Sequence, residues 1–315
     1  MKKIRLGISK CLLGENVRYD GGHRLDNYLK DVVGKYVEWI GICPEVDCGL
    51  TVPREAMRLV GNTQNPRLVT IKTKKDYTEQ MLSWTKQILP WLEKQNLCGF
   101  VFKSKSPSSG MRGVKIYDKD GNVIGLGTGI FAAEYMKYFP FIPVEDDGRL
   151  HNYSLRENFL TRVYIYHRWQ KFLNTENSIK GLVDFHTNHK YLFMSHTQKL
   201  MNELGKLVAN SKKFKKDELI KKYFETMMEG LKRLSSTKNN VNVLYHLMGY
   251  FKEELSSQEK TELVEIIENY KKGFLPLSVP KMLLLHYVKK YNKKYLITQY
   301  YLNPFPIELS SIEYS

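Results

Sequence analysis

The chain has 315 residues, of which 42% are hydrophobic, so it is long and apolar enough for two buried cores and is not a disordered protein. No run approaches the roughly 18 apolar residues of a membrane span. The first residues also lack the apolar core of a secretory signal, so we expect a cytoplasmic protein that has no membrane partner.

The net charge is +16, with 23 basic and 17 acidic side chains in residues 1–150 and 26 and 16 in the remainder. Both halves are therefore basic. This balance favours a polyanionic partner, either nucleic acid or an anionic surface. A generally lysine-rich composition gives the same balance without such a partner.

In residues 1–150, short apolar runs alternate with amphipathic segments, which is typical of an α/β layer fold. We expect strands at residues 4–8, 36–43, 67–72, 99–103 and 114–117, and helices at 25–35, 78–93 and 129–138. The fold class we predict is α/β, with a mostly parallel N-terminal sheet and flanking helices. Cys11, Cys43 and the loop 106–110 each follow a predicted strand. Since sites assemble at the carboxyl edge of parallel sheets, we expect these three segments to converge.

Beyond about residue 154 only helical periodicity remains. We expect helices at 155–173, 179–207, 219–234, 241–255, 263–270 and 282–301. The acidic turn at residues 145–148 is a natural junction. The sequence therefore predicts two domains, an α/β domain at 1–150 and an all-α domain at 151–315.

The four cysteines, Cys11, Cys43, Cys48 and Cys98, all lie in the first third of the chain. A disulfide framework is not expected in the cytoplasm, so metal binding or catalysis is the sharper interpretation and buried free thiols the alternative. Cys43 is followed by Pro44 and Glu45 at a strand end, where proline fixes the chain direction and helps to present the thiol.

Two loops concentrate functional groups. Arg18, Tyr19 and Asp20 offer a charge, a stacking surface and a carboxylate beside two glycines, although a salt bridge between Arg18 and Asp20 explains them equally well. Residues 103–111 provide several hydroxyls and backbone amides that can hold an anion, with a plain polar turn as the alternative.

The motifs together resemble the thiouracil desulfidase (TudS) family over about residues 4–145. The residues that carry the resemblance are Cys11-Leu12-Leu13-Gly14, Val17-Arg18-Tyr19-Asp20-Gly21-Gly22, Cys43-Pro44-Glu45-Val46, Val52-Pro53-Arg54 and Lys103 with Ser106-Pro107-Ser108 and Gly110. The helical half resembles the domain fused to it in RNA desulfidases of the RudS type. This second resemblance is carried by Leu155-Arg156-Glu157-Asn158-Phe159, Phe185-His186-Thr187 and Gly249-Tyr250-Phe251 among others.

The resemblance implies a 4Fe–4S cluster held by three cysteines, with one iron left open. Cys11 and Cys43 match two of the family's ligand motifs, but the third motif has Ser109 in place of cysteine. Serine oxygen is a harder ligand than thiolate and should hold iron poorly. Three alternatives remain open: Cys48 supplies the third thiolate, Ser109 weakens or abolishes the cluster, or Cys98 replaces it.

The implied reaction is the non-redox removal of sulfur from a thiolated pyrimidine. Glu45 is the leading candidate for the base that activates water, Ser106 and Lys103 would position the substrate or stabilise charge, and Asp20 is a weaker catalytic candidate. We expect the substrate to be bound by Arg18, Tyr19, Arg54, Ser108 and Ser109.

The expected substrate is 4-thiouridine in tRNA, with phosphates bound by basic residues of the helical half: Lys212, Lys213, Lys215, Lys216, Lys221, Lys222, Lys232 and Arg233. One alternative is a desulfidase of free thiolated bases. Another is a non-catalytic nucleic-acid-binding protein whose cluster is lost or structural. No obligate protein partner is indicated.

His186, His189 and His196 share one face of a predicted helix. This spacing permits a zinc site, but RNA contacts or a hydrogen-bonded helix interface are the alternatives that we favour.

Overall fold

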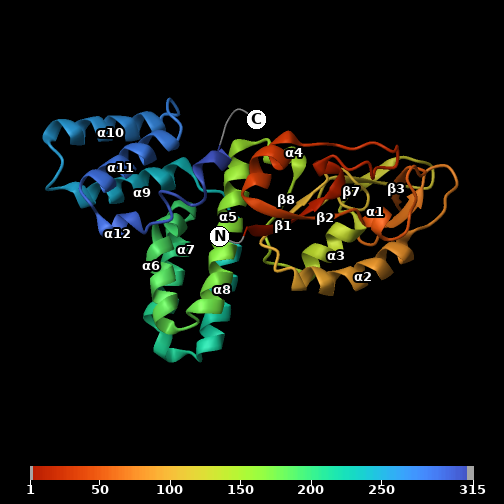
Figure 1. The fold of residues 1–315 in the computed structure, drawn as a ribbon, viewed down its shortest axis with the longest axis horizontal. Coiled ribbons are helices and arrows are strands. Elements are labelled where there is room, and N and C mark those ends of the chain that lie inside the picture. Colours follow the sequence, from red (N-terminus) through yellow and green to blue (C-terminus); the bar gives the residue numbers. More distant parts are fainter. Residues whose placement is uncertain (1–2, 311–315) are drawn as a thin grey trace. The chain divides into compact units, whose positions relative to one another are not determined.

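The computed structural model describes residues 3–310 (Figure 1). These residues form two compact units. The first contains residues 3–167 with 308–310, and the second contains residues 168–307. The division falls inside helix α5 (Tyr153–Thr175), so one continuous helix contributes to both units. The boundary expected at residue 150 lies just before this helix.

The first unit contains all eight strands of the described chain. They are β1 (Ile4–Ser9), β2 (Val37–Ile42), β3 (Met57–Val60), β4 (Arg67–Thr70), β5 (Phe100–Phe102), β6 (Val114–Tyr117), β7 (Val123–Gly127) and β8 (Val144–Asp146). Its helices are α1 (Pro44–Asp47), α2 (Thr78–Lys94), α3 (Ile130–Tyr138), α4 (Asp147–Leu150) and the first part of α5. The mostly parallel α/β class predicted from the sequence is confirmed.

The strands form two sheets rather than the single sheet expected. The first is fully parallel, in the order β2-β1-β5-β8, and it carries the strand ends that matter for the site. The second has the order β4-β3-β6-β7, with a parallel β3–β6 pair between two antiparallel pairs. Neither β3 nor β7 was predicted; β3 pairs with the distant β6, whereas β7 forms a hairpin with β6, its neighbour in sequence.

An aromatic core lies between the parallel sheet and helices α2 and α3. The rings of Phe100 and Phe102 stack with centroids 4.4 Å apart, and Tyr135 of α3 lies 4.8 Å from Phe100. All three side chains are buried, and burying an aromatic side chain of this size contributes about 1.5–3 kcal/mol. This core fixes β5 against β1 and so fixes the loops that leave their carboxyl ends.

The helix expected at residues 25–35 is replaced by two short turns, a π-helical turn at Tyr28–Val32 and a 3₁₀ turn at Val33–Lys35. Gly34 lies in the second turn, and glycine weakens regular helix.

The second unit is entirely helical in the described residues, as predicted. Its helices, after the end of α5, are α6 (Ile179–His196), α7 (Gln198–Ala209), α8 (Lys216–Gly230), α9 (Thr237–Met248), α10 (Ser257–Lys271), α11 (Ser278–Lys290) and α12 (Lys294–Ile297). The single helix predicted at 179–207 is wrong: the hydroxyl of Thr197 accepts a hydrogen bond from the Leu200 amide at 2.9 Å and caps a new helix there. Similarly, the helix predicted at 282–301 ends before Asn292, which is left-handed (φ 47°).

Across residues 3–310, none of the helices is both long enough and apolar enough to cross a lipid bilayer.

Gly7 of β1 tests the packing that aligns the strand ends. A methyl group at Gly7 would lie 2.1 Å from the buried Phe100 ring, so Gly7→Ala must displace the aromatic core. We expect a loss of about 1–3 kcal/mol in the free energy of unfolding, measured by urea denaturation. Gly249→Ala is the matched control, because nothing lies within 4 Å of the added carbon there. Equal stability of the two variants would contradict this account of the core.

Candidate active site

Three strand ends meet at one edge of the parallel sheet. In the β1–β2 pair Ser9 lies opposite Ile42, so Cys11 and Cys43 leave neighbouring strand ends. Strand β5 pairs with the other side of β1, and the Lys103 amide that follows β5 donates a hydrogen bond to Ser9 Oγ at 2.9 Å. The convergence expected from the sequence is therefore present.

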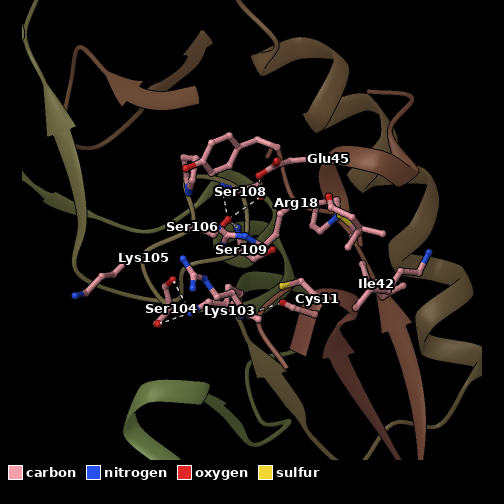
Figure 2. A pocket seen from close by; sticks show the side chains of 18 of the residues that line it. Cys11, Arg18, Ile42, Glu45, Lys103, Ser104, Lys105, Ser106, Ser108 and Ser109 are labelled. Atoms are coloured by element: carbon pink, nitrogen blue, oxygen red, sulfur yellow. Dashed lines mark hydrogen bonds between the residues drawn. The ribbon is translucent and has the colours of Figure 1, made fainter. Parts of the chain in front are cut away.

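The three segments enclose a cavity of about 460 Å³ (Figure 2). This volume lies within the roughly 300–1,000 Å³ of small-molecule sites. The lining includes ten residues that the sequence singled out: Cys11, Arg18, Tyr19, Cys43, Glu45, Arg54, Lys103, Ser106, Ser108 and Ser109.

Cys11 and Cys43 are buried, with 8% and 9% of their surfaces exposed. Burial, with a smaller contribution from Cys43, raises the pKa of the Cys11 thiol to about 11. Burial also raises the pKa of Cys43. With pKa values raised above the ordinary thiol value, both groups are protonated at neutral pH in the absence of a bound cation.

Asp47 holds Cys43 in place. Its carboxylate accepts a hydrogen bond from the Cys43 amide at 2.9 Å and one from Lys10 Nζ at 2.8 Å. Because Lys10 follows β1 and Asp47 follows β2, this ion pair ties the two cysteine-bearing loops together. The role of Asp47 in holding Cys43 was not predicted from the sequence, although Asp47 lies four residues after Cys43 in the same motif.

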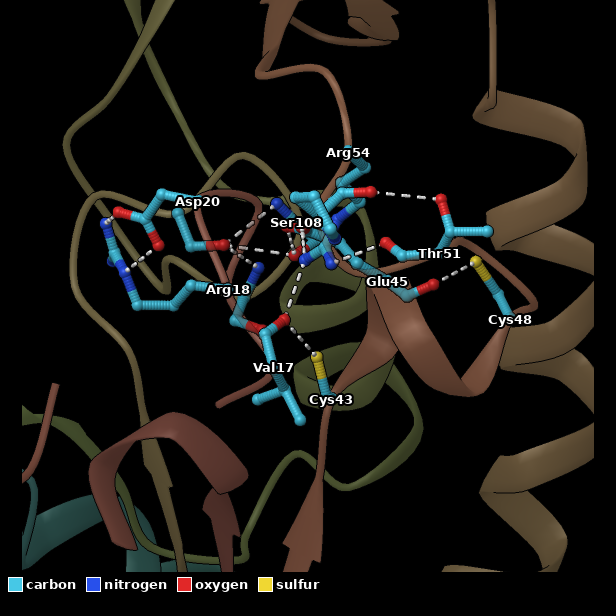
Figure 3. A network of polar contacts seen from close by, with 12 residues as sticks. Val17, Arg18, Asp20, Cys43, Glu45, Cys48, Thr51, Arg54 and Ser108 are labelled. Carbon is cyan, nitrogen blue, oxygen red and sulfur yellow. Dashed lines mark hydrogen bonds and ion pairs between the residues drawn. The ribbon is translucent and has the colours of Figure 1, made fainter. Parts of the chain in front are cut away.

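Glu45 is the most firmly held side chain in the cavity (Figure 3). Arg54 donates from Nε to Glu45 Oε2 at 2.9 Å and approaches the same oxygen with Nη2, while Ser108 Oγ donates to Oε1 at 2.8 Å. Arg54 Nη2 also donates to the Val17 carbonyl at 3.0 Å. Oε2 already accepts both hydrogen bonds from Arg54, whereas Oε1 keeps lone-pair capacity for a further donor, such as a water molecule.

The serine loop is wound tightly against itself. Ser106 Oγ accepts a hydrogen bond from the Ser109 amide at 3.1 Å, and the Ser106 carbonyl accepts one from the Gly110 amide at 2.8 Å. A Cβ at Gly110 would lie 2.7 Å from the Ser106 carbonyl oxygen, so the loop depends on glycine there. This winding fixes the position of Ser109 in the cavity wall.

Lys103 is anchored by a residue that the sequence analysis assigned only to the domain junction. Its Nζ donates to Asp147 Oδ2 at 2.6 Å and to Ser104 Oγ at 2.9 Å. Burial by itself would raise the pKa of the Asp147 carboxyl. The hydrogen bonds that Asp147 accepts from Lys103 and the Ser104 amide outweigh this effect and lower the pKa below its usual value. Asp147 follows β8, so the strand-end rule that found the cysteines applies to it as well.

Comparisons with known proteins find matches for both halves of the chain. A family model described as 2-thiouracil desulfurase matches residues 6–147, and one described as a protein of unknown function, DUF1722, matches residues 190–306. Residues 6–147 are thus similar to the 2-thiouracil desulfurase family.

Two curated proteins and a solved structure are similar to parts of the chain. YbgA of Escherichia coli (strain K12) is 27% identical over 151 residues, covering 48% of this chain and 89% of that protein. YbbK of Bacillus subtilis (strain 168) is 27% identical over 131 residues, covering 40% and 85%. The structure of a 4Fe–4S-dependent thiouracil desulfidase, TudS, is 28% identical and covers 48% of this chain and 93% of its own, with a TM-score of 0.37.

Three residues predicted for the site lie outside the cavity. Asp20 pairs with Arg18 at 3.1 Å with 43% of its side chain exposed, outside the cavity lining. Cys48 directs its sulfur to the Glu45 carbonyl at 3.2 Å and packs with Met81 in the core below the second sheet. Cys98 is buried at the start of β5, with its sulfur 3.8 Å from His167 Nδ1.

The donor set of the cavity can be compared with the cluster that the motifs imply. It contains two thiols, Cys11 and Cys43, with the hydroxyl residue Ser109 at the third position. Within residues 3–310, no group of three or more His, Cys, Asp or Glu side chains is arranged to hold a metal ion. These residues do not fit a cluster held by three thiolates.

The histidines of the helical unit have structural partners. His189 is fully enclosed, bonded to the Phe185 carbonyl at 2.7 Å and to Arg168 Nε at 2.9 Å. His186 Nδ1 lies 3.0 Å from the Tyr223 hydroxyl, and burial lowers the pKa of His186 to about 4. His196 Nδ1 lies 2.6 Å from the Arg233 carbonyl. These contacts are those of a hydrogen-bonded helix interface.

Arg54→Leu tests whether the Glu45 ion pair holds the loops together. The side chains of Arg54 and Glu45 are 7% and 12% exposed, so the substitution leaves a buried carboxylate without its partner. We expect a loss of about 3 kcal/mol in the free energy of unfolding, measured by urea denaturation. Arg67→Leu removes an arginine that is 55% exposed in its pair with Asp76, and should change stability little. Equal losses of stability in the two variants would show that the buried Arg54–Glu45 pair matters no more to folding than an exposed pair.

Proposed function

We propose that this chain hydrolyses the C–S bond of a thiolated pyrimidine, converting 4-thiouridine in tRNA to uridine. The observation that carries the proposal is the placement of Glu45, Lys103 and the paired thiols in one cavity of a 2-thiouracil desulfurase domain. In this reaction a water oxygen bonds to the ring carbon, the C–S bond breaks, and sulfur leaves as hydrogen sulfide. Atoms balance without an oxidant or a reductant.

Three side chains that line the cavity would take part in this reaction. Glu45, fixed by Arg54 and Ser108, would accept the proton of the attacking water. Lys103 and Arg18 carry positive charge beside the cavity and would stabilise the negative charge that develops on sulfur as water adds. Both cations are held by carboxylates, Asp147 and Asp20, which orient them.

Tyr19 supports binding of a base rather than of an aliphatic thiocarbonyl. Its ring is 43% exposed at the cavity, with the Arg18 guanidinium 5.3 Å from the ring centroid. An exposed aromatic ring is the surface on which an unstacked base is usually received. A target base inside folded tRNA has to be unstacked before it enters a cavity of this kind.

The charge of the helical unit supports RNA over a free base as the substrate. Lys212, Lys213 and Lys215 lie close together in the exposed segment between α7 and α8. Clustered exposed cations of this kind bind phosphates with little sequence preference. The helical unit would thus supply affinity for tRNA, while the desulfurase domain supplies the chemistry.

A second candidate function is favoured by one specific observation. Because the cavity offers two thiols rather than three, the chain can be a protein that binds thiolated tRNA without removing sulfur. Binding without loss of 4-thiouridine would identify this function, whereas loss of sulfur from the free base alone would identify a small-molecule enzyme.

The test of the proposed function is incubation of the anaerobically prepared protein with native tRNA, followed by nucleoside analysis for 4-thiouridine and uridine. We expect 4-thiouridine to be lost, and Glu45→Gln to slow the loss by about 100-fold or more, since general base catalysis contributes that much. Glu55→Gln is the control, because Glu55 is bonded to Thr73 on the surface, away from the cavity lining. An unchanged rate in Glu45→Gln would contradict the role of Glu45.

The RNA-binding role is tested by the triple variant Lys212→Ala, Lys213→Ala, Lys215→Ala. We expect weaker tRNA binding and a salt dependence whose log–log slope falls by about 2–3, since each lost phosphate contact removes about 0.7–0.9. The charge-matched control replaces Lys72, Lys74 and Lys75, which are exposed in the segment after β4. If both triple variants weaken tRNA binding equally, binding depends on the net charge of the protein and not on the position of Lys212, Lys213 and Lys215.

A further inference from the structure

The cavity departs from a three-thiolate site at a single side chain. Cys11 and Cys43 occupy two of its walls, and Ser109 lines the same space with only 4% of its surface exposed. Residue 109 thus lines the same cavity as the two thiols, but its side chain carries oxygen instead of sulfur.

The other two cysteines do not compensate for this change. The Cys48 sulfur is turned to the Glu45 carbonyl and the core of the second sheet. Cys98 lies at the amino end of β5, where its amide donates to the Arg5 carbonyl at 2.9 Å. The cavity begins at Lys103, beyond the opposite end of that strand and five residues from Cys98, or about 16 Å at the usual rise per residue. Neither thiol is available to the cavity without refolding its own segment.

The loop that carries Ser109 nevertheless keeps a precise shape. The amide of Phe131, in the first turn of α3, donates to the Ser108 carbonyl at 3.0 Å, and Gly129 donates to the Gly110 carbonyl at 2.7 Å. A Cβ at Gly129 would lie 2.6 Å from the Ser108 carbonyl oxygen, so α3 is packed directly against the loop. Such support is what orients ligands in metal sites.

We propose that Ser109 is the one residue that prevents this domain from retaining an iron–sulfur cluster firmly, and that Ser109→Cys alone completes a three-thiolate site. A neutral hydroxyl is a hard and weakly acidic donor, and iron in such clusters favours the soft thiolate. The substitution adds sulfur at a buried position whose backbone is already fixed, so no other change in the loop is required.

This inference concerns the same cavity as the proposed function, but its test measures iron and not sulfur removal, so the two can fail separately. The wild-type protein and the variants Ser109→Cys, Ser108→Cys and Cys48→Ala are reconstituted anaerobically with iron and sulfide and then desalted. Iron and acid-labile sulfide per chain are counted, and the visible absorption spectrum is recorded.

We expect Ser109→Cys to retain a full complement of iron and sulfide, and wild type to retain about tenfold less, since even weaker changes around metal sites cost 10–100-fold in affinity. Ser108→Cys is the matched control: it adds a thiol one residue away, at the position that bonds Glu45, and should behave as wild type. Cys48→Ala should also match wild type.

Two results would overturn the inference. One is a full complement of iron and sulfide in the reconstituted wild-type protein. The other is a Ser109→Cys protein that melts like wild type by circular dichroism but retains no more iron than Ser108→Cys. If Ser109→Cys does not fold, the prediction that one substitution completes the site is also wrong.

Discussion

The parallel pairing of β1 with β2 on one side and β5 on the other is the constraint on which the site depends. Parallel neighbours end at the same edge of a sheet, so three loops that are far apart in sequence must begin side by side. Gly7 permits this pairing, because only a residue without a side chain leaves room for the Phe100 ring. The cavity is therefore a consequence of sheet topology and core packing, and the loops add the chemistry.

Ion pairs then convert the strand-end loops into a defined cavity. Lys10 with Asp47, Arg54 with Glu45 and Lys103 with Asp147 each join segments that leave different strands or distant parts of one loop. A partly buried pair of this kind is weak support for stability in itself, but removing one partner is costly. Their main effect here is positional: the Arg54 and Asp147 pairs fix Glu45 and Lys103, to which we assign roles in the reaction, and the Lys10–Asp47 pair fixes Cys43.

Much of this arrangement was predictable from the sequence, for identifiable reasons. The apolar runs of β1, β2 and β5 are short and buried, so their ends and the convergence of Cys11 and Cys43 followed from the strand-end rule alone. The second sheet did not follow, because the pairing of β3 with β6 depends on contacts between residues 57–60 and 114–117. The break at Thr197 was missed because an apolar pattern continues across a cap.

Cys48 shows that a short separation in sequence does not predict where a side chain points. Cys48 shares a loop with Cys43, but the intervening turn of helix α1 directs its sulfur into the core. Side-chain direction after a turn depends on the backbone dihedrals of that turn, which spacing does not encode. By contrast, Ser109 could be located from the sequence because it stands in the third ligand motif, in the loop that follows β5.

The central inference is that Cys11 and Cys43 line one cavity and that Cys48 lies outside it. The direct measurement is treatment of the native protein with a trivalent arsenical that bridges two neighbouring thiols, followed by digestion and mass spectrometry. The account predicts one arsenic per chain, bridging the peptides that contain Cys11 and Cys43. A bridge between Cys43 and Cys48, or no bridge between separate segments, would contradict it.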